Sequence, residues 1–283
     1  SKNIKGTTDS ELMFHLFSKL LTFKNYYLRT MKSIVLLGAG NVATHLCKAI
    51  HNLSDFKIIQ VYNHSEKSLI YFPSTLHKTS LLTEIKEADL YIITVPDDAI
   101  VTFSERLLIK GKLVVHTSGS VAMKALSSKN RKGVFYPLQS FSKNSEVDFS
   151  KIPICIEADN DVDLDLLKQL GSSISKNVLT VSSEKREKIH LSAVIVNNFV
   201  NYLYQVANDL MQEQSLSFDL LKPLILETAN KITSLSPAEA QTGPAKRNDK
   251  KTIEKQLNLL KESPYKDIYQ DLTNSILKKY NNK

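Results

Sequence analysis

The stretch MKSIVLLGAGNVATHL, residues 31–46, decides the fold of this chain. Its apolar run Ser33–Leu37 predicts a strand buried on both faces, and the residues that follow predict a helix. Between the two stands Gly38-x-Gly40-x-x-Ala43. In this pattern the first glycine permits a sharp turn, the second lets backbone amides approach a pyrophosphate, and the alanine keeps the helix close to the strand. The stretch therefore predicts the phosphate turn of a dinucleotide-binding domain. The residues expected to bind the cofactor there are Gly38, Ala39, Gly40, Asn41, Val42 and Ala43.

The remainder of the chain predicts two domains. Strand-like runs alternate with helical segments as far as residue 182, a pattern typical of βαβ units and a parallel sheet. Further strands are expected at 57–62, 89–95, 112–116, 133–136, 152–158 and 177–181. Helices alone are expected beyond them, at 184–214, 218–234, 237–241, 252–262 and 266–279. The fold class is therefore α/β: a doubly wound Rossmann domain over 31–182, followed by an all-α C-terminal domain over 183–283.

The end of the second predicted strand bears on the choice of cofactor. An NAD-specific site places Asp or Glu there to bind the ribose 2′-hydroxyl, whereas this chain has Asn63-His64-Ser65. Without a carboxylate a 2′-phosphate is not repelled, and these polar side chains could bind it. An ordinary polar turn would look the same. The sequence favours NADP over NAD.

Two loops follow neighbouring strands of the predicted sheet. Val95 and Pro96 are expected beside the cofactor, because ligands bind beyond the carboxyl ends of the strands in such sheets. Asp97 or Asp98 is expected to cap the helix that begins next.

The second of these loops, His116-Thr-Ser-Gly-Ser120, falls at the same edge of the sheet. His116 could donate a proton or orient a substrate, and Ser118 could hydrogen-bond a carbonyl or carboxylate group. Alternatively, the loop only forms a turn.

The long helix predicted over 184–214 carries an unusual polar stripe. Helical spacing places His190, Asn197 and Asn201 on one face of an otherwise apolar stretch. Asparagine disfavours helix interiors and is costly to bury without partners. The stripe is therefore expected to face a site, a subunit partner or an internal polar network, and His190 and Asn197 are candidate catalytic residues. Lys246 and Arg247, in a later polar loop, could hold an acidic substrate, contact a second subunit or simply be basic surface residues.

Composition excludes several classes of protein. The net charge is +8, but acidic and basic residues alternate without a long basic run, so no nucleic-acid partner is expected. No apolar stretch approaches the roughly 20 residues that are needed to span a bilayer, so an integral membrane protein is not expected. The two cysteines are far apart, which predicts buried thiols in a reduced, cytoplasmic compartment. The histidines show no HxH or HExxH spacing, so no metal site is expected.

Residues 1–30 do not fit the Rossmann pattern. They lack the continuous apolar core of a signal peptide, and Met31 begins the stretch MKSIVLLGAG, which looks like a natural start of translation. We expect an N-terminal extension outside the fold.

The motifs taken together resemble one family. GAGNVATHL, VYNHS, TVPDDAI, HTSGS, YPLQSFS and TGPAKRND occur in the order found in Rossmann-like proteins with a DUF2520 C-terminal domain, over roughly residues 31–283. The resemblance implies an NADP oxidoreductase with a helical dimerisation domain, similar in architecture to pyrroline-5-carboxylate reductase and 6-phosphogluconate dehydrogenase. It also implies that His116–Ser120, His190, Asn197 and Asn198 are polar positions at the domain interface. Tyr136 stands where relatives commonly carry histidine, which weakens the expectation of proton transfer there.

These observations lead to one functional hypothesis and one alternative. The hypothesis is an NADP-dependent oxidoreductase that acts, as a homodimer, on a small carbonyl, imine or hydroxyacid bound between the two domains. His116 or His190 would be the acid or base, with Ser118 and Asn197 positioning the substrate. Because a fold does not imply a function and no clear catalytic lysine is present, the alternative is a non-catalytic NADP-binding regulator.

Overall fold

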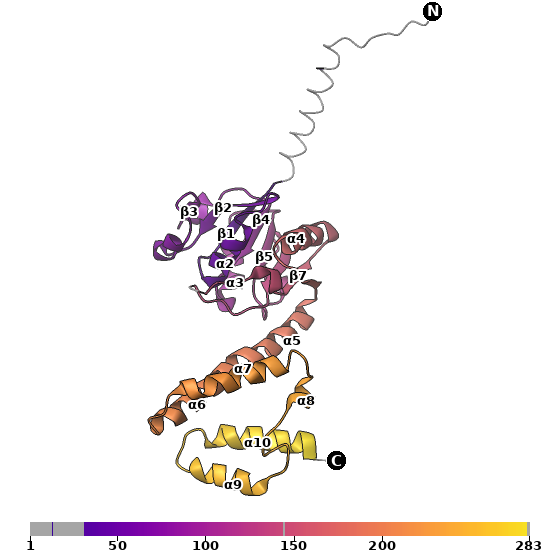
Figure 1. Ribbon diagram of the computed structural model, residues 1–283. Helices are drawn as coiled ribbons and strands as arrows, with labels where there is room; N and C mark the ends of the chain where they lie inside the picture. Colours follow the sequence, from indigo (N-terminus) through magenta and orange to yellow (C-terminus); the bar gives the residue numbers. More distant parts are fainter. Residues whose placement is uncertain (1–12, 14–30, 144, 282–283) are drawn as a thin grey trace, which may run out of the picture. The chain divides into compact units, whose positions relative to one another are not determined.

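The computed structural model describes residues 13, 31–143 and 145–281 (Figure 1). The chain divides into two compact units, one ending at Ile195 and the other formed by Val196–Lys283. We call them the sheet unit and the helical unit. The predicted N-terminal extension, residues 1–30, lies outside the described residues except for Met13. The helix α5 (Ser183–Ala193), expected with the helical domain, is grouped with the sheet.

The sheet unit is built on eight strands in the order β3-β2-β1-β4-β5-β6-β7-β8. They are β1 (Lys32–Leu37), β2 (Phe56–Tyr62), β3 (His77–Thr79), β4 (Leu90–Ile93), β5 (Leu113–His116), β6 (Arg131–Pro137), β7 (Ile154–Ala158) and β8 (Val178–Thr180). All neighbours pair in parallel except β6 and β7. The predicted doubly wound α/β fold is confirmed. The chain order reverses between β1 and β4, which creates the switch point where such sheets bind ligands.

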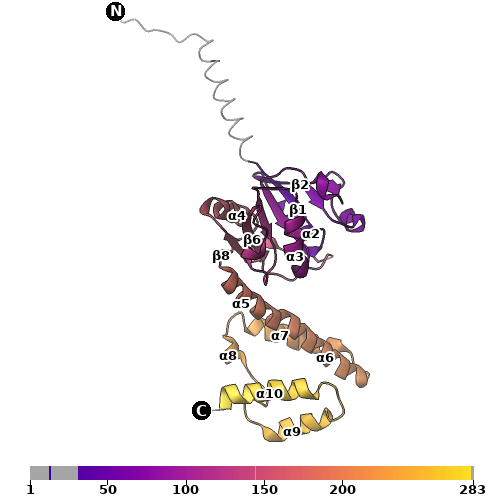
Figure 2. The same cartoon turned by 180° about the vertical axis from the view of Figure 1, so that it is seen from behind.

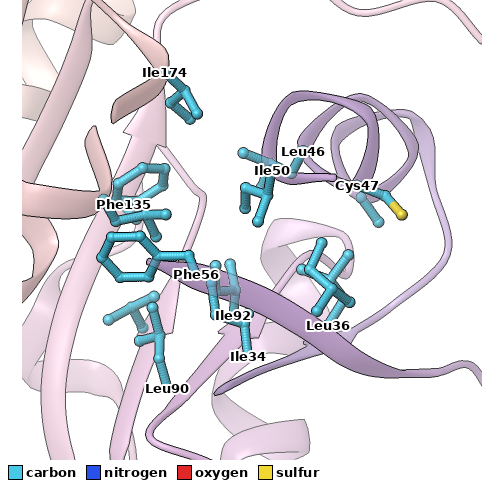
Figure 3. Packing of buried hydrophobic residues seen from close by; sticks show 14 of the residues in the cluster. Ile34, Leu36, Leu46, Cys47, Ile50, Phe56, Leu90, Ile92, Phe135 and Ile174 are labelled. Atoms are coloured by element: carbon cyan, nitrogen blue, oxygen red, sulfur yellow. The ribbon is translucent and has the colours of Figure 1, made fainter. Parts of the chain in front are cut away.

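Helices cover both faces of this sheet. Alternate residues of a strand point to opposite faces, and in β1 both sets are apolar and fully buried. Ile34 and Leu36 pack with residues of α2 (Asn41–Ile50) and α4 (Asp161–Ile174), and Figure 3 shows part of this cluster. Val35 and Leu37 pack on the other face with Ile100 of α3 (Ile100–Arg106). The strand therefore holds the Gly38 turn rigidly at its carboxyl end.

The helix α5 belongs to the face that carries α3. His116 pairs with Val134 across β5 and β6, and Val134 pairs with Glu157 across β6 and β7, so these three side chains share a face. Glu157 forms an ion pair with Arg186 of α5. This contact places α5 on that face, and Figure 2 shows its first turn beside β8.

The helical unit corrects one sequence expectation. Its helices are α6 (Val200–Glu213), α7 (Lys222–Lys231), α8 (Pro237–Ala240), α9 (Lys250–Leu259) and α10 (Lys266–Asn281). The chain is helical over the predicted range 184–214, but a π-helical segment, Val194–Phe199, separates α5 from α6 and interrupts the regular α-helical spacing. A π-turn holds more residues than an α-turn, so α-helical spacing does not align His190 with Asn201. Among the described helices, none is long and apolar enough to cross a bilayer.

Candidate functional site

The glycine turn leaves the first turn of α2 open to an anion. Gly38 has φ +122°, and a Cβ there would lie 2.6 Å from Oγ1 of Thr94. Gly40 is the N-cap residue, so no side chain caps α2, and the first turn contains no acidic residue. Backbone amides at a helix N-terminus lack intrahelical acceptors and, with the helix dipole, favour a negatively charged group. The turn therefore fits a pyrophosphate.

A cavity of about 440 Å³ adjoins this turn. It is lined by Gly38, Ala39, Gly40, Tyr62, Asn63, His64, Ser68, Thr94, Val95, Pro96, Ala99, Thr102, Phe103, Arg106 and Lys143. No carboxylate is among these residues. Arg106 of α3 and Lys143 add positive charge that sequence analysis did not identify, because neither lies near a recognisable motif. The cavity therefore suits a ligand with several phosphate groups.

The other predicted cofactor residues do not line the cavity. Asn41 donates from Nδ2 to the carbonyl oxygen of Phe141, at 2.8 Å. Ala43 is fully buried in the core, and Val42 is partly buried against it. The carbonyl oxygen of Ser65 accepts a hydrogen bond from Nδ2 of Asn63, at 2.9 Å. These residues shape the turn around the cavity.

His116 is fully buried at the end of β5. Its Nδ1 accepts a hydrogen bond from the backbone amide of Ser118 at 3.1 Å, so the remaining proton of the neutral ring lies on Nε2. Nε2 has no partner among the described residues. Desolvation, together with the positive charge of Arg186, lowers the pKa of His116 to about 3. The ring is therefore neutral at physiological pH, and its burial keeps it from the surface of the site.

The loop after β5 is held by its own serines. The hydroxyl of Ser118 accepts from the backbone amides of Ser120 and Val121, at 3.1 and 3.0 Å. Ser120 in turn donates to Oδ2 of Asp97 at 2.6 Å. The expectation that Asp97 caps the following helix is wrong, since no side chain caps the 3₁₀ turn Asp97–Ala99 or α3. The carboxylate instead joins the loops that follow β4 and β5.

The side chain of Arg186 fixes α5 to the sheet. It is fully buried, forms an ion pair with Glu157 and donates to the carbonyl oxygen of Val121 at 2.5 Å. Glu157 also accepts from the hydroxyl and the amide of Ser183, at 2.8 and 2.9 Å. Arg186 was not predicted as a functional residue, because its run of charged neighbours in the sequence is typical of a solvated helix face.

His190 lies one helical turn further along α5 and meets Tyr136. The Tyr136 hydroxyl and Nδ1 of His190 are 3.0 Å apart, and the two rings meet edge to face at 74°. Gly119 lies against the same imidazole, since a Cβ there would be 2.5 Å from Nδ1. Burial raises the pKa of Tyr136 to about 12. Gly119, in the loop after β5, and Tyr136, in β6, thus both lie against the half-buried His190 of α5.

Three other candidate residues, Asn197, Lys246 and Arg247, belong to the helical unit. Asn197 is exposed in the π-helical segment. In the later polar loop, Lys246 donates to the carbonyl oxygen of Gln241 at 2.6 Å, so its ammonium group already has a partner in its own unit. Arg247 is exposed. No cluster of three metal-ligating side chains occurs in the part of the chain that the structure describes.

Comparison with known proteins gives one family and a common fold. The family described as a domain of unknown function (DUF2520) matches residues 152–276. The solved structure of a "putative NADP oxidoreductase" from Bacteroides fragilis is 40% identical, with a TM-score of 0.80 over 88% of this chain and 99% of that one. No curated protein matches.

Two more distant structures share the fold. A protein from Thermotoga maritima is 20% identical, with a TM-score of 0.73 over 86% of this chain and 97% of its own. The pyrroline carboxylate reductase of Plasmodium falciparum, solved with NADP bound, is 13% identical, with a TM-score of 0.54 over 89% of this chain and 97% of its own. At these identities the likeness concerns the fold alone.

Proposed function

This chain belongs to the Rossmann-like protein family with a DUF2520 C-terminal domain, and from that premise we propose that it is an NADP-dependent oxidoreductase. The observation that carries the proposal is the cavity beside the glycine turn, which contains Arg106 and Lys143 but no carboxylate. A nicotinamide dinucleotide phosphate needs such a surface for its three phosphate groups. The names of the similar structures from Bacteroides fragilis and Plasmodium falciparum agree with this cofactor.

In this proposal the glycine turn and the end of β2 bind different phosphate groups of the cofactor. The first-turn amides of α2 would hold the pyrophosphate, and Asn63 and His64 would face the 2′-phosphate. When bound, the cofactor would supply or accept a hydride. The protein would then bind a small carbonyl, imine or hydroxyacid and provide a hydrogen-bonding group to its oxygen or nitrogen atom. His190 is our candidate for that group, because it is half-buried whereas His116 is fully enclosed.

Titration of NADPH and NADH by fluorescence tests the cofactor. We expect NADPH to bind more tightly to the wild-type chain. Asn63→Asp should weaken the binding of NADPH by about tenfold or more relative to the binding of NADH. The new carboxylate would repel the 2′-phosphate of NADPH, whereas it could accept a hydrogen bond from the ribose 2′-hydroxyl of NADH. Ser80→Ala, at a loop position outside the cavity lining, is the matched control. Failure of the wild type to bind either dinucleotide at high micromolar protein would overturn the proposal.

Turnover separates the enzyme from the alternative function. We expect NADPH oxidation with at least one member of a panel of small carbonyls and imines, and the reverse reaction with the matching hydroxyacid. Tight NADPH binding without turnover on either panel would instead identify a non-catalytic NADP-binding regulator. The two buried free thiols, Cys47 and Cys155, support a reducing cytoplasmic compartment as the place of this activity.

We also propose that the protein is a homodimer joined through the helical unit. Leu220, Leu224 and Leu226 are 66%, 64% and 64% exposed. Such large apolar side chains, close together in the chain, are typical of a surface that a partner covers. Size-exclusion chromatography with light scattering should give twice the mass of the chain. A monomer mass at micromolar concentration would contradict the proposal.

A further inference from the structure

We propose that Tyr136 is a positioning residue for His190: its hydroxyl donates to Nδ1 and thereby holds the imidazole as the tautomer with its proton on Nε2. The inference deepens the proposed oxidoreductase function and depends on it for the reaction. The tautomer of His190 does not depend on the proposed function, because it is a property of the protein alone.

The phenol is well placed to act as a fixed donor. Tyr136 lies in β6 and pairs with Cys155 of β7, so the neighbouring strand holds its backbone. Its side chain is only 8% exposed and packs in a small apolar cluster with Val134 and Cys155. A side chain on a packed strand holds its geometry better than one on a loop.

The direction of this hydrogen bond follows from which polar group would lose its partner if the other group were the donor. A phenol hydroxyl and a neutral imidazole can each donate or accept. Among the described residues, Nδ1 of His190 is the hydrogen-bond partner of the phenol, at 3.0 Å. If Nδ1 carried the proton and donated, the phenolic hydrogen of a buried side chain would lose its acceptor, which is unfavourable. Since burial also raises the pKa of Tyr136 to about 12, the phenol keeps that hydrogen throughout the neutral range.

The position of the ring depends on a second residue. Gly119 lies under the imidazole, where a Cβ would come within 2.5 Å of Nδ1 and 2.6 Å of Cγ. Any larger residue would push the ring away from the phenol. Three separate segments, at residues 119, 136 and 190, are therefore needed to set one hydrogen bond.

The consequence is an imidazole that donates from Nε2. The two ring nitrogens lie on different edges of the imidazole, so Nε2 is free of the phenol while Nδ1 is engaged. Because His190 is half-buried, its Nε2–H is available to a ligand. In the proposed reaction it would donate a hydrogen bond to the carbonyl oxygen or imine nitrogen of the substrate and polarise that bond.

Nitrogen NMR of the full chain tests the tautomer without reference to turnover. In ¹⁵N-labelled protein at pH 8, we expect His190 to show a protonated Nε2 and an unprotonated Nδ1. Tyr136→Phe removes the donor but keeps the ring, and should move both nitrogen shifts toward those of a tautomer mixture. Gly119→Ala should do the same with the phenol intact. Tyr204→Phe, which removes a half-exposed phenol from the helical unit, is the control and should change nothing.

Two results would overturn the inference. One is a protonated Nδ1 on His190 in the wild type, and the other is an unchanged pair of nitrogen shifts in Tyr136→Phe. Once a substrate is found, Tyr136→Phe should lower kcat by about tenfold or more while KM changes little. If no substrate is found, the proposed function fails but the NMR result still decides the role of Tyr136.

Discussion

Lowering the pH from 7 to 5 should destabilise the sheet unit through the buried His116. Desolvation and the charge of Arg186 lower its pKa from 6.5 to about 3 in the folded protein. In the unfolded chain the ring is solvated and has its ordinary pKa. Between pH 6.5 and 3 the unfolded state therefore binds a proton that the folded state does not. Stability rises with pH wherever the unfolded state binds more protons, so His116 favours the folded state fully only above its unfolded pKa.

The size of this effect follows from the same two pKa values. One pKa unit corresponds to about 1.4 kcal/mol, and pH 5 lies 1.5 units below the unfolded pKa of 6.5. The folded pKa of about 3 is lower still, so the folded ring stays almost entirely neutral at pH 5. We expect His116 to cost about 2 kcal/mol of the free energy of unfolding at pH 5 relative to pH 7.

Urea unfolding followed by far-UV circular dichroism at both pH values measures this loss. His116→Asn is the matched variant, because its side-chain oxygen can still accept from the Ser118 amide but does not titrate. The difference in unfolding free energy between wild type and variant should shrink by about 2 kcal/mol from pH 7 to pH 5, while contributions from carboxylates cancel. Equal losses in the two proteins would refute the reasoning. So would a folded-state His116 NMR resonance that titrates near pH 6.5.

Two further substitutions test the architecture of the site. Gly38→Ala places a Cβ 2.6 Å from Oγ1 of Thr94 on a backbone with φ +122°, and should cost about 1–3 kcal/mol of stability and weaken NADPH binding, as measured by thermal unfolding and fluorescence titration. Arg186→Met leaves the carboxylate of Glu157 without its buried partner and should cost about 3 kcal/mol in urea unfolding. Adding Glu157→Gln should recover much of that loss, and a double variant as unstable as the single one would show that the ion pair is not the cause.

Local sequence patterns predicted most of the sheet, but not every strand or the direction of each strand. The strand Ser33–Leu37, the turn at Gly38 and the helix after it were predictable because each is specified by neighbours in the chain. Alternating strands and helices then imply a doubly wound sheet. The three-residue β3 was missed because it is too short to show a period. The reversed direction of β7 was missed because a reversal depends on which strands pair.

Some features of the candidate site likewise follow from the local sequence, and others depend on the tertiary structure. The sequence by itself determined the glycine turn and the lack of a carboxylate after β2, since the position of a residue in a βαβ unit follows from local order. Only the tertiary structure decided that Tyr136 contacts His190 and that Arg186 is buried, because these contacts join residues far apart in the chain. It also decided the state of His116: the motif predicted an acid or base, whereas enclosure by the sheet and α5 lowers its pKa and keeps it neutral. Burial and pairing depend on the whole fold, and they determine which of several plausible side chains can take part in the chemistry.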